Sequence, residues 1–365
     1  MADKIDYHKS VNYSQADPIK VLAQNEGKAT AGNMPVGFTE IEGTRGESAY
    51  LFKMPSGYGA FVQEGLGTKS LIAQSVYRKT KKSYFKEVAQ DTVACIINDL
   101  VSVGAKPIVL NAYWSSSSYE WLTDETLAGD LIKGWRQACD EAEVVWGGGE
   151  TQALSNVIED GVLELAGSAF GFIDDENKII RGQNLKAGDV VIFIESSGVH
   201  ANGISLIREI ASKLPEGYET KLDDGRTLAE AVLQPTPLYS NLIQSVQKAG
   251  VSVHYASNIT GHGWRKIMRS EINHGYIIDQ LAPKNALFDF IAENSGNDVR
   301  DMYGNYNMGA GYALYIARED SEKTLKAAKS AGYNAWLAGS VTNGPKQVDI
   351  KPLGIKFSED TLEVR

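Results

Sequence analysis

Four short strings in this chain set charged or hydroxyl side chains among glycines or small residues, and they follow one another in a fixed order. They are QEGLGTKS from Gln63, INDL from Ile97, WGGGET from Trp146 and SSGVHANG from Ser196. Glycine lets the backbone approach a ligand closely, and backbone N–H groups can then bind an anion. Carboxylate oxygens suit a divalent cation. The four strings together predict a site for phosphate and a divalent metal, assembled from several loops.

Length and charge narrow the classes of protein to which the chain can belong. A chain of 365 residues exceeds the size at which single hydrophobic cores usually stop growing, so we expect two domains. Hydrophobic residues make up 43% and charged residues 22%, which is typical of a globular rather than a disordered chain. The formal net charge of −10 argues against a nucleic-acid-binding protein. A small anionic substrate remains compatible, because local loops and a metal ion can override the overall charge.

The number of cysteines and the lengths of the apolar segments indicate in which cellular compartment the protein lies. Cys95 and Cys139 are the only cysteines, too few for a disulfide scaffold or a cysteine-ligated zinc site, and neither belongs to a C-x-x-C motif. The N-terminal MADKIDYHKS lacks the apolar segment of a signal peptide, and no run of about 18 apolar residues occurs. We therefore expect a soluble cytoplasmic protein that does not bind membranes.

In the first half, the spacing of apolar residues predicts the following elements. The polar N-terminal stretch reads as an extended arm with one short helix from Asp17. ESAYLFKM and YGAFVQEG, on either side of a Pro-Ser-Gly turn, predict a β-hairpin. Helical spacing covers 84–103 and 123–142, with Thr123 as a plausible N-cap of the second helix. Strands are expected from Pro107 and at LELAGSAFGFI, and VVWGGGET reads as a strand that ends in a glycine turn.

The polar segment DDENKIIRGQNLKAGD then interrupts the apolar pattern, and we place a domain boundary there, near Asp174. The two domains are 1–174 and 175–365. In the second half we expect a strand at VVIFIES, an amphipathic helix from Gly203, further helices at about 228–233, 237–249, 285–294 and 321–330, and strands at GYALYIA and NAWLAGSV. Strands and helices mix in both halves, so the predicted fold class is mixed α+β (α/β) with two domains.

QEGLGTKS is the candidate for binding phosphate. Two glycines allow close backbone approach, Thr68 offers a hydroxyl and Lys69 a positive charge. The string is not a P-loop, because Thr68 separates the lysine from the glycine. Taken alone, the string is more often a tight turn followed by a solvated lysine, because such turns are common.

Three carboxylates are candidate ligands of Mg²⁺, which prefers oxygen ligands from a few carboxylates together with substrate phosphates: Glu64, Asp99 and Glu150. Asp99 can alternatively be a cap or turn residue near a helix end, and Glu150 a carboxylate at the N-terminus of the following segment. His200, with Ser197 and Asn202 nearby and a helix after it, suggests an anion site with a proton shuttle. A structural histidine in a glycine loop is the alternative.

Taken together and in order, these strings resemble aminoimidazole ribonucleotide (AIR) synthetase, also called phosphoribosylformylglycinamidine cyclo-ligase. The resemblance runs from about Tyr50 to Gly339. The family's D-G-V-G-T-K matches 64–69, its N-D-L and G-A-x-P match 98–100 and 104–107, its G-G-E-T matches 148–151, its S-S-G-x-H-S-N-G matches 196–203, its A-P-T-x-x-Y resembles 234–239 and its M-Y-x-x-F-N-x-G-x-G resembles 302–311.

This resemblance implies a homodimer whose N-terminal strands form a barrel across the interface, a C-terminal α/β domain, and ATP and Mg²⁺ in the reaction. The implied reaction of de novo purine biosynthesis is ATP-dependent cyclisation of formylglycinamidine ribonucleotide, a phosphoribosyl substrate, through an iminophosphate. By the same resemblance, the catalytic residues are Lys69, Asp99 and His200; the ATP-binding residues are Gly65, Gly67, Thr68, Lys69, Asn98, Gly148, Gly149, Glu150 and Thr151; the substrate-binding residues are Ser197, Gly198, His200, Asn202, Gly203 and Asn307; and the metal ligands are Glu64, Asp99 and Glu150.

Four departures from the family pattern fall at the implied site, one of which is that 152–156 (QALSN) replaces the family's A-E-M-P-G after G-G-E-T. Glu64 stands where the family has aspartate, and His262 interrupts the family's T-G-G-G. The segment VGFTEIEGTRGESAYLF replaces the family's glycine-rich cover over the nucleotide. The departures fit a divergent synthetase, a related ATP-dependent phosphotransferase with a different substrate, or a non-catalytic dimeric binding homologue.

Overall fold

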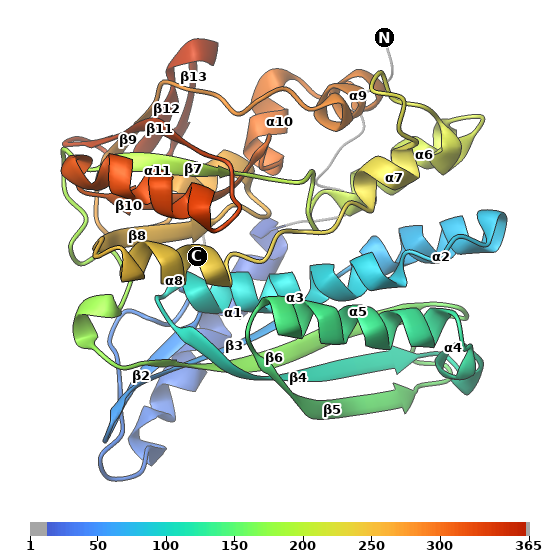
Figure 1. Cartoon of the computed structure of the whole chain (residues 1–365), viewed down its shortest axis with the longest axis horizontal. Coiled ribbons are helices and arrows are strands. Elements are labelled where there is room, and N and C mark those ends of the chain that lie inside the picture. The colour runs from blue at the N-terminus through green and yellow to red at the C-terminus, as the bar shows by residue number, and fades with distance from the viewer. Residues whose placement is uncertain (1–12, 363–365) are drawn as a thin grey trace.

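The computed structural model describes residues 13–362 and contains two mixed β-sheets with helices packed between and around them (Figure 1). The first sheet has six strands in the order β1-β2-β3-β6-β4-β5. Figure 1 shows α2, α3 and α5 on one face of this sheet. The strands are β1 (Thr39–Glu40), β2 (Tyr50–Met54), β3 (Gly57–Gly65), β4 (Lys106–Ser116), β5 (Val145–Ala153) and β6 (Leu163–Ile173). The helices of this half are α1 (Tyr13–Ala29), α2 (Lys69–Thr80), α3 (Phe85–Ser102), α4 (Tyr119–Thr123) and α5 (Leu127–Glu141).

The second sheet has seven strands in the order β13-β12-β9-β11-β7-β10-β8, and its pairs are antiparallel except for β9 with β12. Every residue of strand β10, which lies between β7 and β8, is buried, which agrees with its continuous apolar sequence. The strands are β7 (Val190–Glu195), β8 (Val253–Asn258), β9 (Gly275–Ile278), β10 (Ala310–Ile316), β11 (Ala335–Thr342), β12 (Gln347–Ile350) and β13 (Ile355–Ser358). The helices are α6 (Ile204–Lys213), α7 (Leu228–Val232), α8 (Ser240–Lys248), α9 (Ala286–Ser295), α10 (Val299–Asn305) and α11 (Ser321–Ser330).

The mixed α+β fold class is confirmed, and so are several of its elements. The predicted hairpin is the antiparallel pair β2 and β3, with Tyr50 opposite Phe61. Gly59 leaves space for the ring of Phe52, because a Cβ at this position would lie 2.5 Å from that ring unless the ring moved. The helix expected over 84–103 is α3, whose apolar residues Val88, Val93 and Ile97 are fully buried.

Three local predictions were wrong. A helix from Asp17 is confirmed, but the extended arm is not: α1 spans Tyr13–Ala29 because good helix formers follow Pro18, and residues 1–12 of the expected arm lie outside the described range. Thr123 ends α4, and α5 starts after a break because the Asp124 carboxylate accepts hydrogen bonds from the N–H groups of Thr126 and Leu127. The glycines of WGGGET lie inside the continuous strand β5, where a Cβ at Gly149 would lie 2.1 Å from the carbonyl oxygen of Ala112.

Helix α3 joins the two halves. It lies between the first sheet and the second half of the chain (Figure 1), and 13 of its 18 residues are buried, among them the polar Asp91 and Asn98. Its Ser102 hydroxyl is 2.7 Å from the hydroxyl of Tyr312 on β10. Neither α3 nor any other helix within residues 13–362 combines the length and the apolar character needed to cross a bilayer.

Candidate functional site

A cavity of about 450 Å³ opens where segments of both halves converge. The end of β3 and the loop before α2 form one part of its wall, and α3 contributes another. The loop before α6 and the segment after β8 complete it. The lining residues are Lys20, Glu64, Gly65, Leu66, Gly67, Cys95, Asp99, Ala201, Asn202, Asn258, Thr260, Gly261, His262, Lys266, Arg269 and Leu362.

Two carboxylates from different elements face this cavity, Glu64 near the end of β3 and Asp99 in the last turn of α3. Burial and then the negative charge of Asp99 raise the pKa of Glu64 to about 7, against the opposing charges of Lys266 and Arg269. Asp99 also accepts a hydrogen bond of 2.8 Å from the side-chain amide of Asn258. A carboxylate whose ionised form is disfavoured by a neighbouring carboxylate indicates a place where a bound cation is stabilised.

The donor set fits Mg²⁺. Besides the two carboxylates, the buried Oδ1 of Asn258 has no hydrogen-bond partner within residues 13–362. Glu64, Asp99 and Asn258 would thus offer three oxygen ligands, a number that suits a cation which also binds phosphate and water. Glu150 does not join them, because it lies exposed on the edge strand β5. Over the described range no group of three or more His, Cys, Asp and Glu side chains could hold a metal ion.

The loop before α2 brings to the cavity backbone groups that suit an anion. Gly67 has φ +75°, and a Cβ there would meet no atom within 4 Å, so this backbone faces open space. Thr68 is the N-cap of α2 and its hydroxyl makes no capping hydrogen bond. The N–H groups in the first turn of a helix have no intrahelical acceptors, and together with the helix dipole they favour a negatively charged group.

Two cations in the cavity, Lys266 and Arg269, were missed by the sequence analysis. Lys266 belongs to the 3₁₀ helix Gly263–Met268, and Arg269 follows it. Burial, and then the charge of Arg269, lower the pKa of Lys266 to about 8. The guanidinium of Arg269 donates to the hydroxyl of Ser48 at 2.9 Å and to the carbonyl of Gly46 at 3.0 Å. The available signal was the basic string WRKIMR directly after the glycines of TGHG.

Lys69, predicted to hold phosphate, is not at the cavity. Its side chain is fully buried, and its ammonium lies 2.7 Å from Oδ2 of Asp91, which is also fully buried. The same ammonium donates to the carbonyl of Gln234 at 3.2 Å. The other oxygen of Asp91 accepts hydrogen bonds from the backbone N–H and the hydroxyl of Thr236. In this arrangement Lys69 connects α2 and α3 to the loop 234–239 of the second half.

His200 also lies away from the cavity, although its neighbours Ala201 and Asn202 line it. The ring is buried, and its two nitrogens have no hydrogen-bond partner in the described part of the chain. Burial, with a smaller contribution from the charge of Lys69, lowers the pKa of His200 to about 3. The imidazole is therefore neutral near pH 7. A Cβ at Gly311 would lie 2.5 Å from this ring, so close packing holds it in place.

Other predicted site residues have structural hydrogen bonds. Asn98 donates to the carbonyl of Pro237 at 2.9 Å and accepts from the N–H of Tyr239 at 2.8 Å. Asn307 donates to the carbonyl of Gly198 at 2.8 Å. The structure brings Glu64, Gly65, Gly67, Asp99 and Asn202 to the cavity. Outside its lining lie Thr68, Lys69, Asn98, Gly148, Gly149, Glu150, Thr151, Ser197, Gly198, His200, Gly203 and Asn307.

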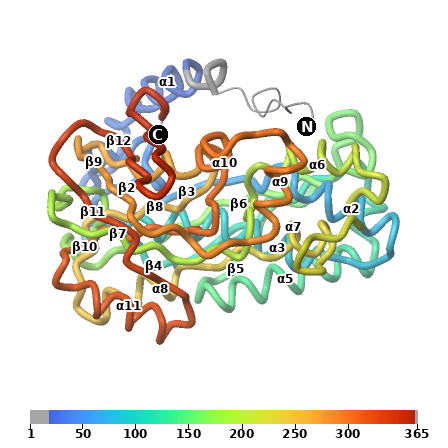
Figure 2. The backbone as a smooth tube through the Cα atoms, turned by 90° about the horizontal axis from the view of Figure 1, so that it is seen from above, coloured from blue at the N-terminus to red at the C-terminus, as the bar shows by residue number. Residues whose placement is uncertain are grey.

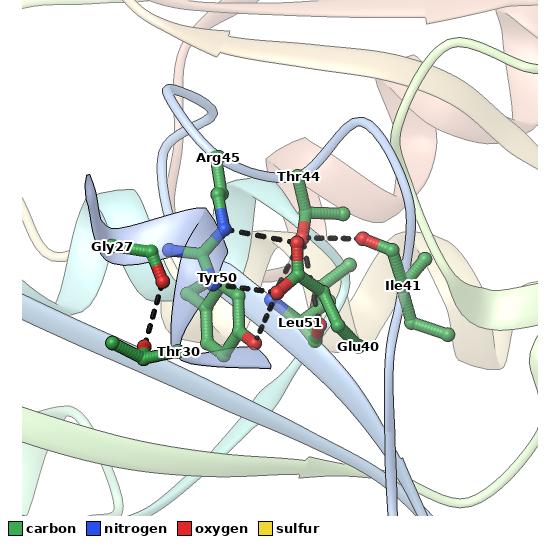
Figure 3. Close-up of polar contacts among 8 residues, drawn as sticks. All are labelled: Gly27, Thr30, Glu40, Ile41, Thr44, Arg45, Tyr50 and Leu51. Atoms are coloured by element: carbon green, nitrogen blue, oxygen red, sulfur yellow. Dashed lines mark hydrogen bonds and ion pairs between the residues drawn. The ribbon is translucent and has the colours of Figure 1, made fainter. Parts of the chain in front are cut away.

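The segment that stands in place of the expected glycine-rich cover is held by side chains. Figure 3 shows Arg45 making two hydrogen bonds, of 2.9 and 2.6 Å, to the carboxylate of Glu40, which also accepts from the hydroxyl of Tyr50. α1 and the C-terminal segment lie near each other at one edge of the molecule (Figure 2), and Lys20 and Leu362 from these segments line the cavity. Helix α1 and the C-terminal segment therefore contribute to the wall of the cavity.

The chain matches two family models, one for each half. Residues 46–173 match the model described as AIR synthase related protein, N-terminal domain, and residues 186–351 match AIR synthase related protein, C-terminal domain. A phosphoribosylformylglycinamidine cyclo-ligase of Methanothermobacter thermautotrophicus is 32% identical over 308 residues, 84% of this chain and 86% of that protein. One from Pyrococcus furiosus is 32% identical over 316 residues, 86% of this chain and 88% of that protein.

Solved structures share the fold at lower sequence identity. A chain of the HypE–HypF complex superposes with a TM-score of 0.60 at 20% identity, covering 87% of this chain and 94% of that chain. PurL of Thermotoga maritima, complexed with FGAR, gives a TM-score of 0.54 at 14% identity and covers 86% of this chain and 46% of that chain. At these identities the likeness shows the fold alone.

Proposed function

Because this chain belongs to the AIR synthase related protein family, we propose that it closes formylglycinamidine ribonucleotide to 5-aminoimidazole ribonucleotide at the expense of ATP. Relatives that match most of its length are named phosphoribosylformylglycinamidine cyclo-ligase, so the enzyme is a ligase with a role in purine biosynthesis. The observation that carries the finer proposal is the meeting of Glu64 and Asp99 in one cavity, beside the loop that leads into α2.

The chemistry explains why such a cavity is needed. An amide oxygen is a poor leaving group, so it first attacks the γ-phosphorus of ATP, and ADP departs to leave an iminophosphate. The neighbouring nitrogen then bonds to the same carbon, the C–O bond breaks, phosphate leaves with the former amide oxygen, and the nitrogen releases a proton. The backbone around Gly67 and the start of α2 would hold the transferred phosphoryl group. Mg²⁺ bound at Glu64 and Asp99 would supply positive charge to the phosphates.

A further part of the proposal is a homodimer formed through the uncovered face of the first sheet. Four apolar residues stand in one row across strands β3, β6, β4 and β5, since Phe61 pairs with Phe170, Phe170 with Val109 and Val109 with Val145. Phe61 is 46% exposed and Val145 is 65% exposed. A second copy packed on this row would bury it. Light scattering should give twice the mass of one chain, and Val145→Glu should give the mass of one chain.

The activity is tested by incubating the purified protein with Mg-ATP, with and without formylglycinamidine ribonucleotide, while phosphate and the aminoimidazole product are measured together. We expect equal amounts of the two products only when the ribonucleotide is present. Asp99→Asn, which keeps the shape of the side chain, should reduce turnover by about 100-fold or more. Asp140→Asn, on the exposed surface of α5, is the matched control and should retain full turnover. Absence of product from the wild type would overturn the proposal.

A second candidate is a related ATP-dependent phosphotransferase with another substrate. It is favoured by His262, which lines the cavity where a glycine is expected, and by the nearby Lys266, which lines the same cavity. Burial, together with the charges of Arg265 and Lys266, lowers the pKa of His262 to about 3, so this neutral imidazole changes the shape of the cavity more than its charge. ATP binding without formation of the aminoimidazole, followed by phosphate transfer to a different acid or amide, would favour this candidate.

A further inference from the structure

The candidate cavity collects positive charge in a chain whose net charge is −10. Among the residues of 13–362 that line it, Lys20, Lys266 and Arg269 are basic, whereas Glu64 and Asp99 are acidic. This excess of basic over acidic side chains runs opposite to the composition of the whole chain. A cavity that reverses the sign of the overall charge focuses anions toward itself.

The charges of Lys266 and Arg269 are not neutralised by close ion pairs. Within the described residues neither Lys266 nor Arg269 forms a salt bridge, which means that no carboxylate oxygen lies within 4.0 Å of their side-chain nitrogens. Lys266 donates to the hydroxyl of Thr260. The Nε of Arg269 is buried and has no hydrogen-bond partner in residues 13–362.

Burial makes such charges effective. Arg269 is only 7% exposed, so its charge acts through protein rather than through water. Its two terminal nitrogens already bind Gly46 and Ser48, which fixes the guanidinium at the cavity wall before any ligand arrives. An anion that enters therefore meets a cation that does not have to reorganise, and charge-assisted hydrogen bonds of this kind are the strong ones.

We propose that Lys266 and Arg269 form an anion subsite for the polyphosphate part of the ligand, so that the cavity binds polyphosphate without a divalent cation. The inference rests on the proposed function in that both place ATP in this cavity. Lys266 and Arg269 share the cavity with Glu64 and Asp99, so that positive charge comes both from the protein and from Mg²⁺ when that ion is bound. The same subsite accepts inorganic triphosphate, which has the three negatively charged phosphate groups of ATP but no nucleoside.

The test is calorimetric titration of the full chain with inorganic triphosphate in metal-free buffer. The wild type should bind, and Lys266→Gln should weaken the affinity by about tenfold or more, as expected for removal of one strong charge-assisted contact. Lys326→Gln removes the same charge from the exposed face of α11 and should change the affinity by less than about twofold. Lys266→Arg keeps the charge and should retain most of the binding.

Arg269 is examined with a pair of variants, because it also ties down the backbone at Gly46. Arg269→Lys should keep much of the metal-free binding and lower the melting temperature, whereas Arg269→Gln should reduce both. The proposal is overturned if the wild type binds triphosphate only after Mg²⁺ is added. It is equally overturned if folded Lys266→Gln, checked by its melting curve, binds as tightly as the wild type.

Failure of this inference is distinguishable from failure of the proposed cyclo-ligase activity. Metal-free triphosphate binding that depends on Lys266, without any aminoimidazole product from Mg-ATP and the ribonucleotide, supports the subsite and rejects the reaction. Product formation together with unchanged triphosphate binding in Lys266→Gln rejects the subsite and leaves the reaction standing.

Discussion

The buried ion pair between Lys69 and Asp91 makes a prediction that separates a structural role from phosphate binding. Both side chains are fully buried, with 2.7 Å between the ammonium and Oδ2 of Asp91. Lys69→Met removes the ammonium and keeps a similar chain length, so the Asp91 carboxylate is left with its two hydrogen bonds from Thr236. Burial already raises the pKa of Asp91. Breaking a buried pair from one side costs about 3–5 kcal/mol of the free energy of unfolding.

Differential scanning calorimetry measures this loss. With about 2.1 cal/mol/K of unfolding entropy per residue, a chain of 365 residues that unfolds as one cooperative unit should melt about 4–6 °C lower. Lys69→Met combined with Asp91→Asn should recover more than half of the loss, since a neutral amide oxygen still accepts from Thr236 and no buried charge remains. Such a recovery is a double-mutant coupling between two residues in contact.

The same variants decide whether Lys69 contacts the nucleotide. If Lys69 stays with Asp91, the double variant should bind ATP within about threefold of the wild type, a difference below 1 kcal/mol. The reasoning is refuted if Lys69→Met melts within about 1 °C of the wild type while ATP affinity falls by tenfold or more, which corresponds to about 1.4 kcal/mol. That result would mean that the lysine leaves Asp91 to bind phosphate.

Three further predictions concern other parts of the fold. The hydrogen bond from Arg45 lowers the pKa of Glu40 below its ordinary value of 4.5, so the carboxylate stabilises the fold above pH 4.5 and this stabilisation is lost as the pH falls through the lowered pKa. Glu40→Gln should therefore have a lower melting temperature than the wild type at pH 7. An equal difference in melting temperature at pH 3 would contradict this. His200 is kept neutral by burial, so the wild type should lose stability as the pH falls from 6.5 toward 3, and His200→Leu should lose less over the same range. Gly149→Ala should destabilise the chain by about 1–3 kcal/mol and accelerate amide exchange in β5, because the new Cβ would overlap the carbonyl of Ala112; unchanged exchange would show that β5 shifts to accommodate it.

Much of the fold was predictable because burial leaves a periodic trace in the sequence. The helical spacing from Phe85 to Val101 predicted α3, and the two apolar strings around a turn predicted the hairpin of β2 and β3. The three glycines 147–149 led to the wrong prediction of a turn, since glycines usually mark turns. Here all three lie in β5, and the backbone of Ala112 on β4 leaves no room for a Cβ at Gly149, which only the pairing of the two strands shows.

The site was predictable only in part. Glu64, Gly67 and Asp99 were predicted because they belong to short strings that combine polar side chains with glycines or small residues, and all three line the cavity. Lys69 was placed at the phosphate because it follows the same glycines. Its actual partner Asp91 lies on another helix, and burial of both side chains on α2 and α3 favours the ion pair.

The sequence by itself determined the kinds of groups available to this protein, namely glycine loops, a few carboxylates and the periodic helices and strands that carry them. The tertiary structure decided which of these groups meet. Asp99 and its partner Asn258 are 159 positions apart, and Lys266 reaches the same cavity from a short 3₁₀ helix with no recognisable period. Electrostatic interactions act through space and depend on burial, and both quantities arise only when the two halves of the chain pack together.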